Sequence, residues 1–204
     1  MGSDASVVPA TNPGARVDTI TLVSTVCGGT APVPTSAVSR KVHGAAGPFD
    51  IALPLVGVGG AVGIECRTNA TPGTHQLVVT FPGPVTVGSV AVTTGTGNAT
   101  FSVAGSVVTV DLTGVTDAQR LGLTLSNAND GSNLGSVLVP MGMLAGDATG
   151  NGTVTASDID QVKGQSGQAV TATNFRTDVT ASGGTINSSD IGLVKSRSGT
   201  QLPP

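Results

Sequence analysis

The sequence predicts a mainly β protein in which a β-sandwich is followed by a small C-terminal α domain. Short runs of Val, Thr and other strand-forming residues recur at regular spacing through residues 49–144. Gly, Pro, Asn or Asp separates most of these runs, as expected for strands joined by tight turns. After Gly146 the pattern changes to an internal repeat with helical spacing. The regular strands therefore predict the sandwich, and the repeat predicts the α domain.

The composition excludes several classes of function. Nine Lys and Arg residues and a net charge of −3 are too little positive charge for a nucleic-acid surface. The chain has no Trp or Tyr and only four Phe, so it lacks platforms on which bases or sugar rings could stack. No run approaches the roughly 18 consecutive apolar residues that span a bilayer. We therefore expect no nucleic-acid partner, no membrane span and no small-molecule substrate.

Residues 1–40 are expected to form an N-terminal extension. Within it, residues 16–26 have the branched side chains of a β-strand, and the Gly/Pro-rich stretch that follows is a linker. Ile20 and Leu22 lie on one face of this strand and are suited to fill the core of a neighbouring copy. The alternative is that the strand completes its own sandwich, because sequential strands often pair.

The two cysteines, Cys27 and Cys66, are predicted to form a disulfide, either within one chain or between neighbouring chains. In the chain-entropy model such a bond removes roughly 4 kcal/mol of unfolded-state freedom. The alternative is two buried free thiols. Sparse charge and many Ser and Thr residues favour an extracellular or cell-surface protein, where disulfides persist. Residues 1–15 lack the basic and apolar regions of a signal peptide, so a secretion signal would have been removed or would lie outside this sequence.

The sandwich domain is expected to cover residues 41–145. Alternation of apolar and polar residues is clean in residues 108–112 and 121–125, which predicts one buried and one solvated sheet face. Short strands with turn signals about every 8–12 residues are typical of an immunoglobulin-like sandwich. The expected strands are residues 49–55, 62–67, 75–81, 85–94, 99–105, 106–112, 119–126 and 135–144.

Residues 146–204 contain two copies of one structural unit. The motif Ser-Asp-Ile-x-x-Val-Lys-x-x-Ser-Gly begins at Ser157 and again at Ser189. A match of this length within one chain is hard to obtain by chance. Ile159 and Val162 have the spacing of a short amphipathic helix. The repeat therefore predicts two loops, each followed by a helix.

The residues of each loop have the spacing that calcium requires. Ca²⁺ takes six to eight oxygen ligands, which a tight loop supplies from alternate positions. In the first loop the candidate ligands are Asp147, Thr149, Asn151, the carbonyl of Thr153 and the closing Asp158. In the second loop they are Asp178, Thr180, Ser182 and the closing Asp190. Gly183-Gly184 lengthens the second loop by one residue, which leaves its seventh-position carbonyl open between Gly184 and Thr185.

These motifs resemble the dockerin family, in which paired calcium loops each precede a helix and Asp closes each loop. The resemblance covers about residues 146–203 and implies two Ca²⁺ sites and attachment to a cohesin-like β-sandwich. By the same resemblance, the residues that face the partner are Ala156, Ser157, Lys163, Ser188, Ser189 and Lys195. The sequence departs from the family pattern at the third position, which is Thr, at the neutral fifth position, and at the extra glycine.

Each loop has two carboxylates, so the expected calcium affinity is weak, with a dissociation constant of roughly 10⁻⁴ to 10⁻³ M. The alternative is a pair of polar turns that cap helices without metal, because Asp before a helix is a common N-cap.

No catalytic constellation is visible, so we do not expect an enzyme. His43 and His75 are far apart in sequence, and the chain has no nucleophile elbow, zinc-ligand spacing, phosphate loop or dinucleotide fingerprint. Glu65 is the only glutamate, and it is expected either to face solvent or to pair with Arg67 or Arg40.

Two functions follow from these observations. The first is a non-enzymatic, self-assembling structural protein, in which copies join through sandwich and tail, or through the N-terminal strand, into a surface fibre or layer. The second is a dockerin-type module that anchors its sandwich to a separate cohesin-bearing scaffold. The chain carries no catalytic or sugar-binding cargo, which favours the first.

Overall fold

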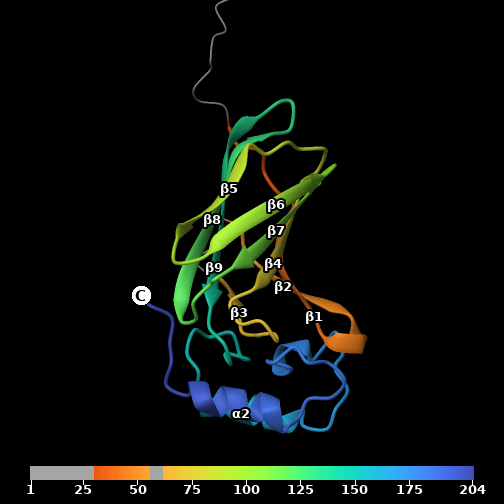
Figure 1. The fold of residues 1–204 in the computed structure, drawn as a ribbon, viewed down its shortest axis with the longest axis vertical. Coiled ribbons are helices and arrows are strands. Elements are labelled where there is room, and N and C mark those ends of the chain that lie inside the picture. Colours follow the sequence, from red (N-terminus) through yellow and green to blue (C-terminus); the bar gives the residue numbers. More distant parts are fainter. Residues whose placement is uncertain (1–29, 56–61) are drawn as a thin grey trace, which may run out of the picture.

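The computed structural model describes residues 30–55 and 62–204 (Figure 1). Within these ranges the protein is mainly β, with two sheets and two short α-helices, consistent with a β-sandwich. No helix of the described part is long and apolar enough to cross a membrane. The expectations for Ile20, Leu22 and Cys27 concern residues outside these ranges.

One sheet has five strands in the order β2-β1-β4-β7-β6, all antiparallel. Its strands are β1 (Ser36–Val42), β2 (Pro48–Ala52), β4 (His75–Thr80), β6 (Asn98–Ala104) and β7 (Val107–Thr113). The other sheet has the order β3-β9-β8-β5, and only β3 runs parallel to its neighbour, β9. Its strands are β3 (Gly63–Glu65), β5 (Ser89–Thr94), β8 (Gln119–Asn129) and β9 (Leu134–Met143). All eight predicted strands from residue 49 onward therefore have a counterpart.

Strand β1 is the one described strand that the sequence did not predict. It begins at Ser36, so the expected domain start at residue 41 falls inside a strand of the five-stranded sheet. Its inward side chains are Ala37, Ser39 and Lys41, all at most 4% exposed. Two of these three are polar, so the strand lacks the apolar alternation by which strands are recognised.

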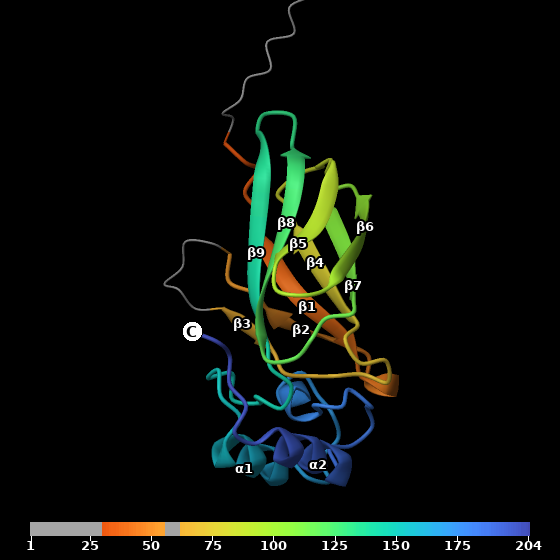
Figure 2. The same ribbon diagram turned by 60° about the vertical axis from the view of Figure 1, so that its left-hand side comes forward.

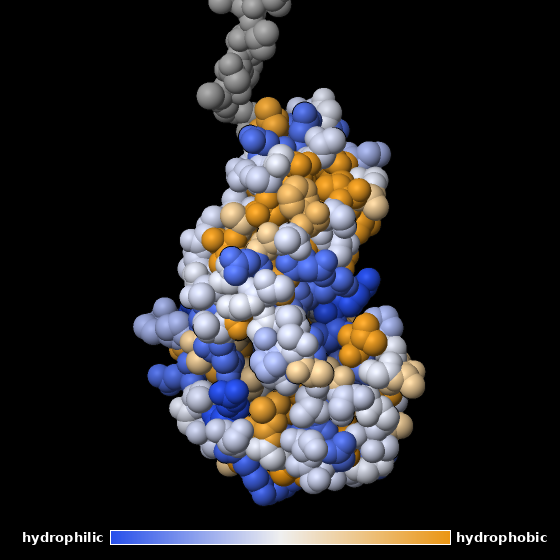
Figure 3. Space-filling model, in the orientation of Figure 1, coloured by the Kyte–Doolittle hydropathy of each residue, from blue (hydrophilic) through white to orange (hydrophobic). Residues whose placement is uncertain are grey.

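The two sheets enclose an apolar core to which both contribute. Leu77, Val79 and Val110 from one sheet and Leu123 and Val139 from the other are completely buried. On the face shown in Figure 3, apolar surface gathers over the sandwich half, whereas the opposite end is more mixed. The exposed large apolar side chains of the described residues are Val33, Val42, Phe101, Val103, Leu134 and Leu138.

The loop-helix region, residues 146–204, covers one end of the sandwich. Its helices, α1 (Ala156–Gly164) and α2 (Ser188–Arg197), lie side by side at the end of the molecule (Figure 2). Thr155 and Asn187 are their N-caps, and each cap forms a capping box with the closing Asp three residues later.

A second apolar core lies beneath these helices and is shared with the sandwich. The repeat contributes Val154 and Ile186 from its loops and Val162 and Val194 from its helices. The sandwich side contributes Ile64 and Leu144. The loop-helix region is therefore packed directly onto the sandwich through a common core.

Candidate metal centre

In the first loop two carboxylates converge on one hydroxyl group. Thr149 Oγ1 lies 3.2 Å from Asp147 Oδ1 and 2.8 Å from Asp158 Oδ1, and both carboxylates are completely buried. A hydroxyl has one proton and can donate it to only one of them. The other carboxylate oxygen therefore faces the hydroxyl oxygen without a hydrogen between them. Backbone N–H groups of Gly150, Asn151 and Gly152 donate to Asp147 at 2.8 to 3.1 Å.

The other two predicted ligands of this loop lie at its rim. Asn151 Oδ1 accepts from both the backbone N–H and the hydroxyl of Thr153, at 2.9 Å each. The closing Asp158 also accepts the backbone N–H of Thr155, the helix cap, at 2.8 Å. Burial raises the pKa of Asp158, but the hydrogen bonds from Thr149 and Thr155 outweigh it and leave that pKa below its usual value.

The second loop repeats this arrangement. Thr180 Oγ1 lies 3.3 Å from Asp178 Oδ1, 2.8 Å from Asp190 Oδ1 and 3.1 Å from Ser182 Oγ. Asp178 and Asp190 are also completely buried. Burial, reinforced by the charge of Asp178, raises the pKa of Asp190 above its usual value.

The glycine pair of the second loop replaces a single glycine of the first. Gly152 donates its N–H to Asp147 and accepts from Leu202 N through its carbonyl. In the second loop Gly183 donates to Asp178, whereas the carbonyl of Gly184 accepts from Val170 N. Gly183 and Gly184 thus share the two hydrogen bonds that Gly152 makes alone. The residue equivalent to Thr153 is therefore Thr185 rather than Gly184.

The chemistry of these donor sets fits calcium. The convergent groups are carboxylate and hydroxyl oxygens, the hard ligands that Ca²⁺ prefers, and two buried carboxylates in each loop need a counter-charge. No cluster of three or more His, Cys, Asp or Glu side chains suited to a metal occurs in residues 30–55 and 62–204. Each loop would therefore rely on hydroxyl, amide and backbone oxygens beside its two carboxylates.

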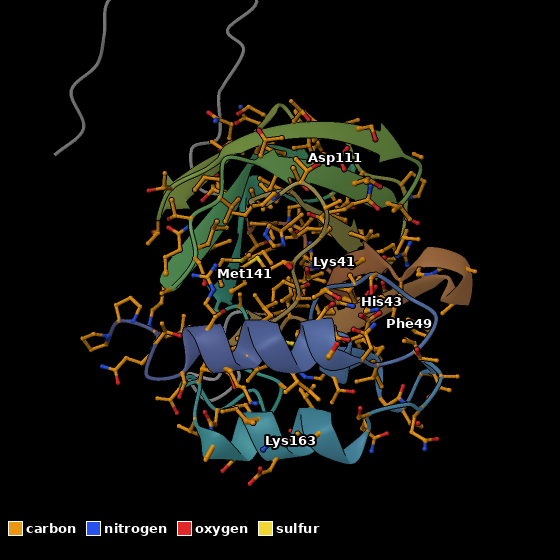
Figure 4. The ribbon with its side chains drawn as sticks, turned by 60° about the horizontal axis from the view of Figure 1, so that its bottom comes forward. Lys41, His43, Phe49, Asp111, Met141 and Lys163 are labelled. Carbon is orange, nitrogen blue, oxygen red and sulfur yellow. The ribbon has the colours of Figure 1, made fainter. Side chains whose placement is uncertain are left out.

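The residues that the dockerin resemblance assigns to a partner surface are all exposed. Ala156, Ser157 and Lys163 lie on α1, and Lys163 lies on its outer side in Figure 4. The equivalent residues of α2 are Ser188, Ser189 and Lys195.

A buried polar network joins the sandwich to the second loop. The sequence offered its Glu65–Arg67 pair as one alternative but gave no sign of the links from Arg67 to His43 and Asp178. Glu65 and Arg67 form a bidentate ion pair with N···O distances of 2.8 Å, and both are completely buried. Arg67 Nη1 lies 3.1 Å from His43 Nε2, and His43 Nδ1 lies 2.8 Å from Asp178 Oδ2. Figure 4 shows His43 and Phe49 beside the loop that leads into α2.

The environment of Glu65 corrects one of the two expectations for that residue. It does not face solvent but pairs with Arg67, whereas Arg40 pairs with Asp50. Burial alone would raise the pKa of Glu65, but Arg67, Lys41 and Ser39 together lower it to about 2. A carboxyl group in this state cannot donate a proton at neutral pH.

His75 gives the sandwich a specific dependence on pH. Burial, with a contribution from the Lys41 charge, lowers the pKa of His75 to about 4, whereas an unfolded histidine has a pKa of about 6.5. The unfolded state therefore binds more protons between these values, and stability is lost as pH falls from about 6.5 to 4. We expect His75→Gln to reduce this loss by about 2 to 3 kcal/mol. Urea unfolding followed by circular dichroism checks this, and an unchanged pH dependence would contradict it.

The expected Cys27–Cys66 disulfide involves Cys27, which lies outside the described residues, so the bond within one chain and the bond between chains both stay predictions. Cys66 itself is completely buried. A bond to a neighbouring chain would therefore require Cys66 to be uncovered.

Cys66 should be nearly inert in the folded protein. It is completely buried, and burial raises the pKa of its thiol to about 11. In a Cys27→Ser variant, where Cys66 is the sole thiol, we expect labelling by a disulfide reagent to be about 100-fold slower than in denaturant, since only a small thiolate fraction is present. Rapid stoichiometric labelling of the native variant would show that the junction opens.

Comparisons with protein-family models, with curated protein sequences and with solved structures found no match to this chain.

Proposed function

We propose that this protein is a non-enzymatic, calcium-binding structural protein that works outside the cell and assembles with copies of itself. In this proposal an immunoglobulin-like sandwich carries a dockerin-like pair of calcium loops. The observation that supports it most strongly is the convergence of two buried carboxylates on one threonine hydroxyl in both loops. Buried like charges are unfavourable unless a cation or a proton neutralises one of them.

The ligand count supports an extracellular site of action. Two carboxylates per loop are fewer than in high-affinity cytosolic sites, and loops of such low charge bind calcium with dissociation constants of roughly 10⁻⁴ to 10⁻³ M. Calcium reaches such concentrations outside cells, so loops of this kind would be filled there and empty in the cytosol.

The non-enzymatic part of the proposal is supported by the state of the titratable groups. Glu65 is saturated by Arg67 and Ser39, and His43 is held between Arg67 and Asp178. Buried polar groups that are fully paired stabilise a fold but are not free to act on a substrate.

The open edge of β9 supports self-assembly. Among the described residues β9 pairs with β3 only over Met141–Met143, so residues 134–140 have no strand on that side. A groove of about 300 Å³ lies beside this edge and is lined mainly by apolar residues, including Val33, Leu55 and Leu138. Residues 16–26 of a second copy, with Ile20 and Leu22 on one face, have the length and pattern to add a strand there.

The exposed face of the helices favours a second candidate function, a dockerin-type anchor for a cohesin-like scaffold protein. All six residues that the resemblance assigns to a partner lie exposed on α1 and α2. If this candidate is right, the protein is monomeric and its helices bind a different β-sandwich.

Light scattering and electron microscopy of the purified protein, with calcium and with EDTA, distinguish the two candidates. Self-assembly predicts polymers that Ile20→Asp/Leu22→Asp abolishes, whereas the matched pair Thr19→Asp/Thr21→Asp, on the opposite strand face, has a smaller effect. Lys163→Glu/Lys195→Glu tests the helix surface in the same way. A wild-type protein that remains monomeric at all calcium concentrations would contradict self-assembly and leave the anchor as the favoured function.

A further inference from the structure

The two loops have different surroundings, although their sequences repeat. Among the described residues, every hydrogen bond to the Asp147 and Asp158 carboxylates of the first loop comes from residues 149–155. In the second loop Asp178 Oδ2 accepts from Gly183 N at 2.9 Å and also contacts His43 Nδ1 at 2.8 Å. His43 belongs to the sandwich and directly follows β1.

The geometry around His43 defines which of its nitrogens carries the proton. Arg67 can only donate, so His43 Nε2, at 3.1 Å from Arg67 Nη1, must accept. His43 Nδ1 is then the nitrogen that carries hydrogen, and it donates to Asp178. The rings of Phe49 and Phe175 stack on each other and contact His43 edge to face, with centroid distances of 5.4 and 6.2 Å, and His43 is completely buried. The histidine is therefore held in one orientation toward the loop.

The backbone of the sandwich also touches the second loop directly. A Cβ atom on Gly183 would lie 2.1 Å from the carbonyl oxygen of His43, and one on Gly44 would lie 2.7 Å from that of Ser182. Both glycines have positive φ, at +73° and +48°. Only glycine allows two segments of the backbone to approach this closely in this conformation.

We propose that the sandwich completes the second calcium loop, with His43 as a positioning residue for Asp178, so that calcium at this loop and docking of the sandwich stabilise each other. This inference rests on the proposed calcium binding. A side chain that orients a metal ligand by hydrogen bonding raises the affinity for the metal. Because such coupling is reciprocal, calcium at the second loop should strengthen the contact with residues 43–44 by the same free energy. Calcium at the first loop should not.

Two single-loop proteins test this asymmetry. Asp158→Asn leaves only the second loop able to bind, and Asp190→Asn leaves only the first. In the Asp158→Asn background we expect His43→Ala to weaken calcium binding about 10- to 100-fold, a typical effect for such a supporting residue. His43→Asn keeps an N–H donor and should recover part of the loss. In the Asp190→Asn background neither substitution should change the affinity of the first loop, and His75→Gln serves as the histidine control in both.

Hydrogen exchange provides a second readout that does not require the His43 variants to fold. Calcium should slow exchange of amides in residues 36–52 in the Asp158→Asn protein and leave it unchanged in the Asp190→Asn protein. Calcium bound at both loops with equal effects on residues 36–52, or no effect in either protein, would overturn the inference and leave the proposed function standing. A wild-type protein that binds no calcium would overturn both.

Discussion

Replacing Arg67 with methionine is expected to lower the free energy of unfolding by about 3 to 5 kcal/mol, the cost of breaking a buried ion pair from one side. The substitution removes the bidentate partner of a buried carboxylate, because two side-chain N–H groups of Arg67 donate to the two oxygens of Glu65. The hydroxyl of Ser39 and the nearby charge of Lys41 then still favour the ionised form of Glu65. The substitution also removes donors to the carbonyls of Ser39 and Phe49. Thermal and urea unfolding followed by circular dichroism measure the loss.

Two control variants separate burial from charge in this experiment. Arg40→Met breaks the exposed ion pair with Asp50, whose side chains are 40% and 34% exposed, and should cost at most about 1 kcal/mol. Adding Glu65→Gln to Arg67→Met removes the unpaired charge and should recover part of the stability. If Arg67→Met costs no more than Arg40→Met, the network does not hold the junction together.

The same network determines how the protein responds to acid. The pKa of Glu65 is lowered to about 2, well below the value of about 4.3 for an unfolded glutamate. Its contribution is therefore present above about pH 4.3 and is lost as pH falls toward 2. In Arg67→Met this part of the acid dependence should disappear.

Calcium is expected to have the second large effect, a rise in stability at millimolar concentrations. With a dissociation constant of roughly 10⁻⁴ M, a concentration 100 times higher stabilises the folded state by about 2.7 kcal/mol for each site. Calorimetry with calcium and with EDTA should show this as a shift in melting temperature. Asp158→Ala should reduce the shift more than Thr149→Ala, because it removes a charged ligand rather than a neutral one. A melting temperature that does not change with calcium would contradict the proposal.

Strands from Phe49 onward could be predicted because their sequence pattern depends on the apolar core between the sheets. In β8, Leu123 and Leu125 alternate with the less buried Thr124 and Ser126 as the period of a strand requires. Strand β1 could not be found in this way because its inward residues Ser39 and Lys41 meet the polar network rather than the apolar core. The inward side chains of β1 are buried as in any core strand, but the sequence does not show which polar groups they contact.

The candidate loops could be predicted from sequence, because the residues of each loop are close together in the chain and their pattern occurs twice. The role of His43 could not be predicted, because its partner Asp178 lies 135 residues further along the chain and only the fold brings the two together. One signal pointed to this region: residues 40–43 contain three basic side chains in a chain with only 10% charged residues. Such a cluster of charge in a poorly charged protein indicates that specific partners exist, but it does not identify them.

The most direct test of the account is the number of calcium ions that the protein binds. Isothermal titration with the wild-type chain should give two sites, Asp158→Asn and Asp190→Asn should give one each, and the double variant should give none, because each substitution removes a carboxylate on which its loop depends. Binding of two ions to the double variant, or no binding to the wild-type chain at about 10 mM calcium, well above the expected dissociation constants, would contradict it.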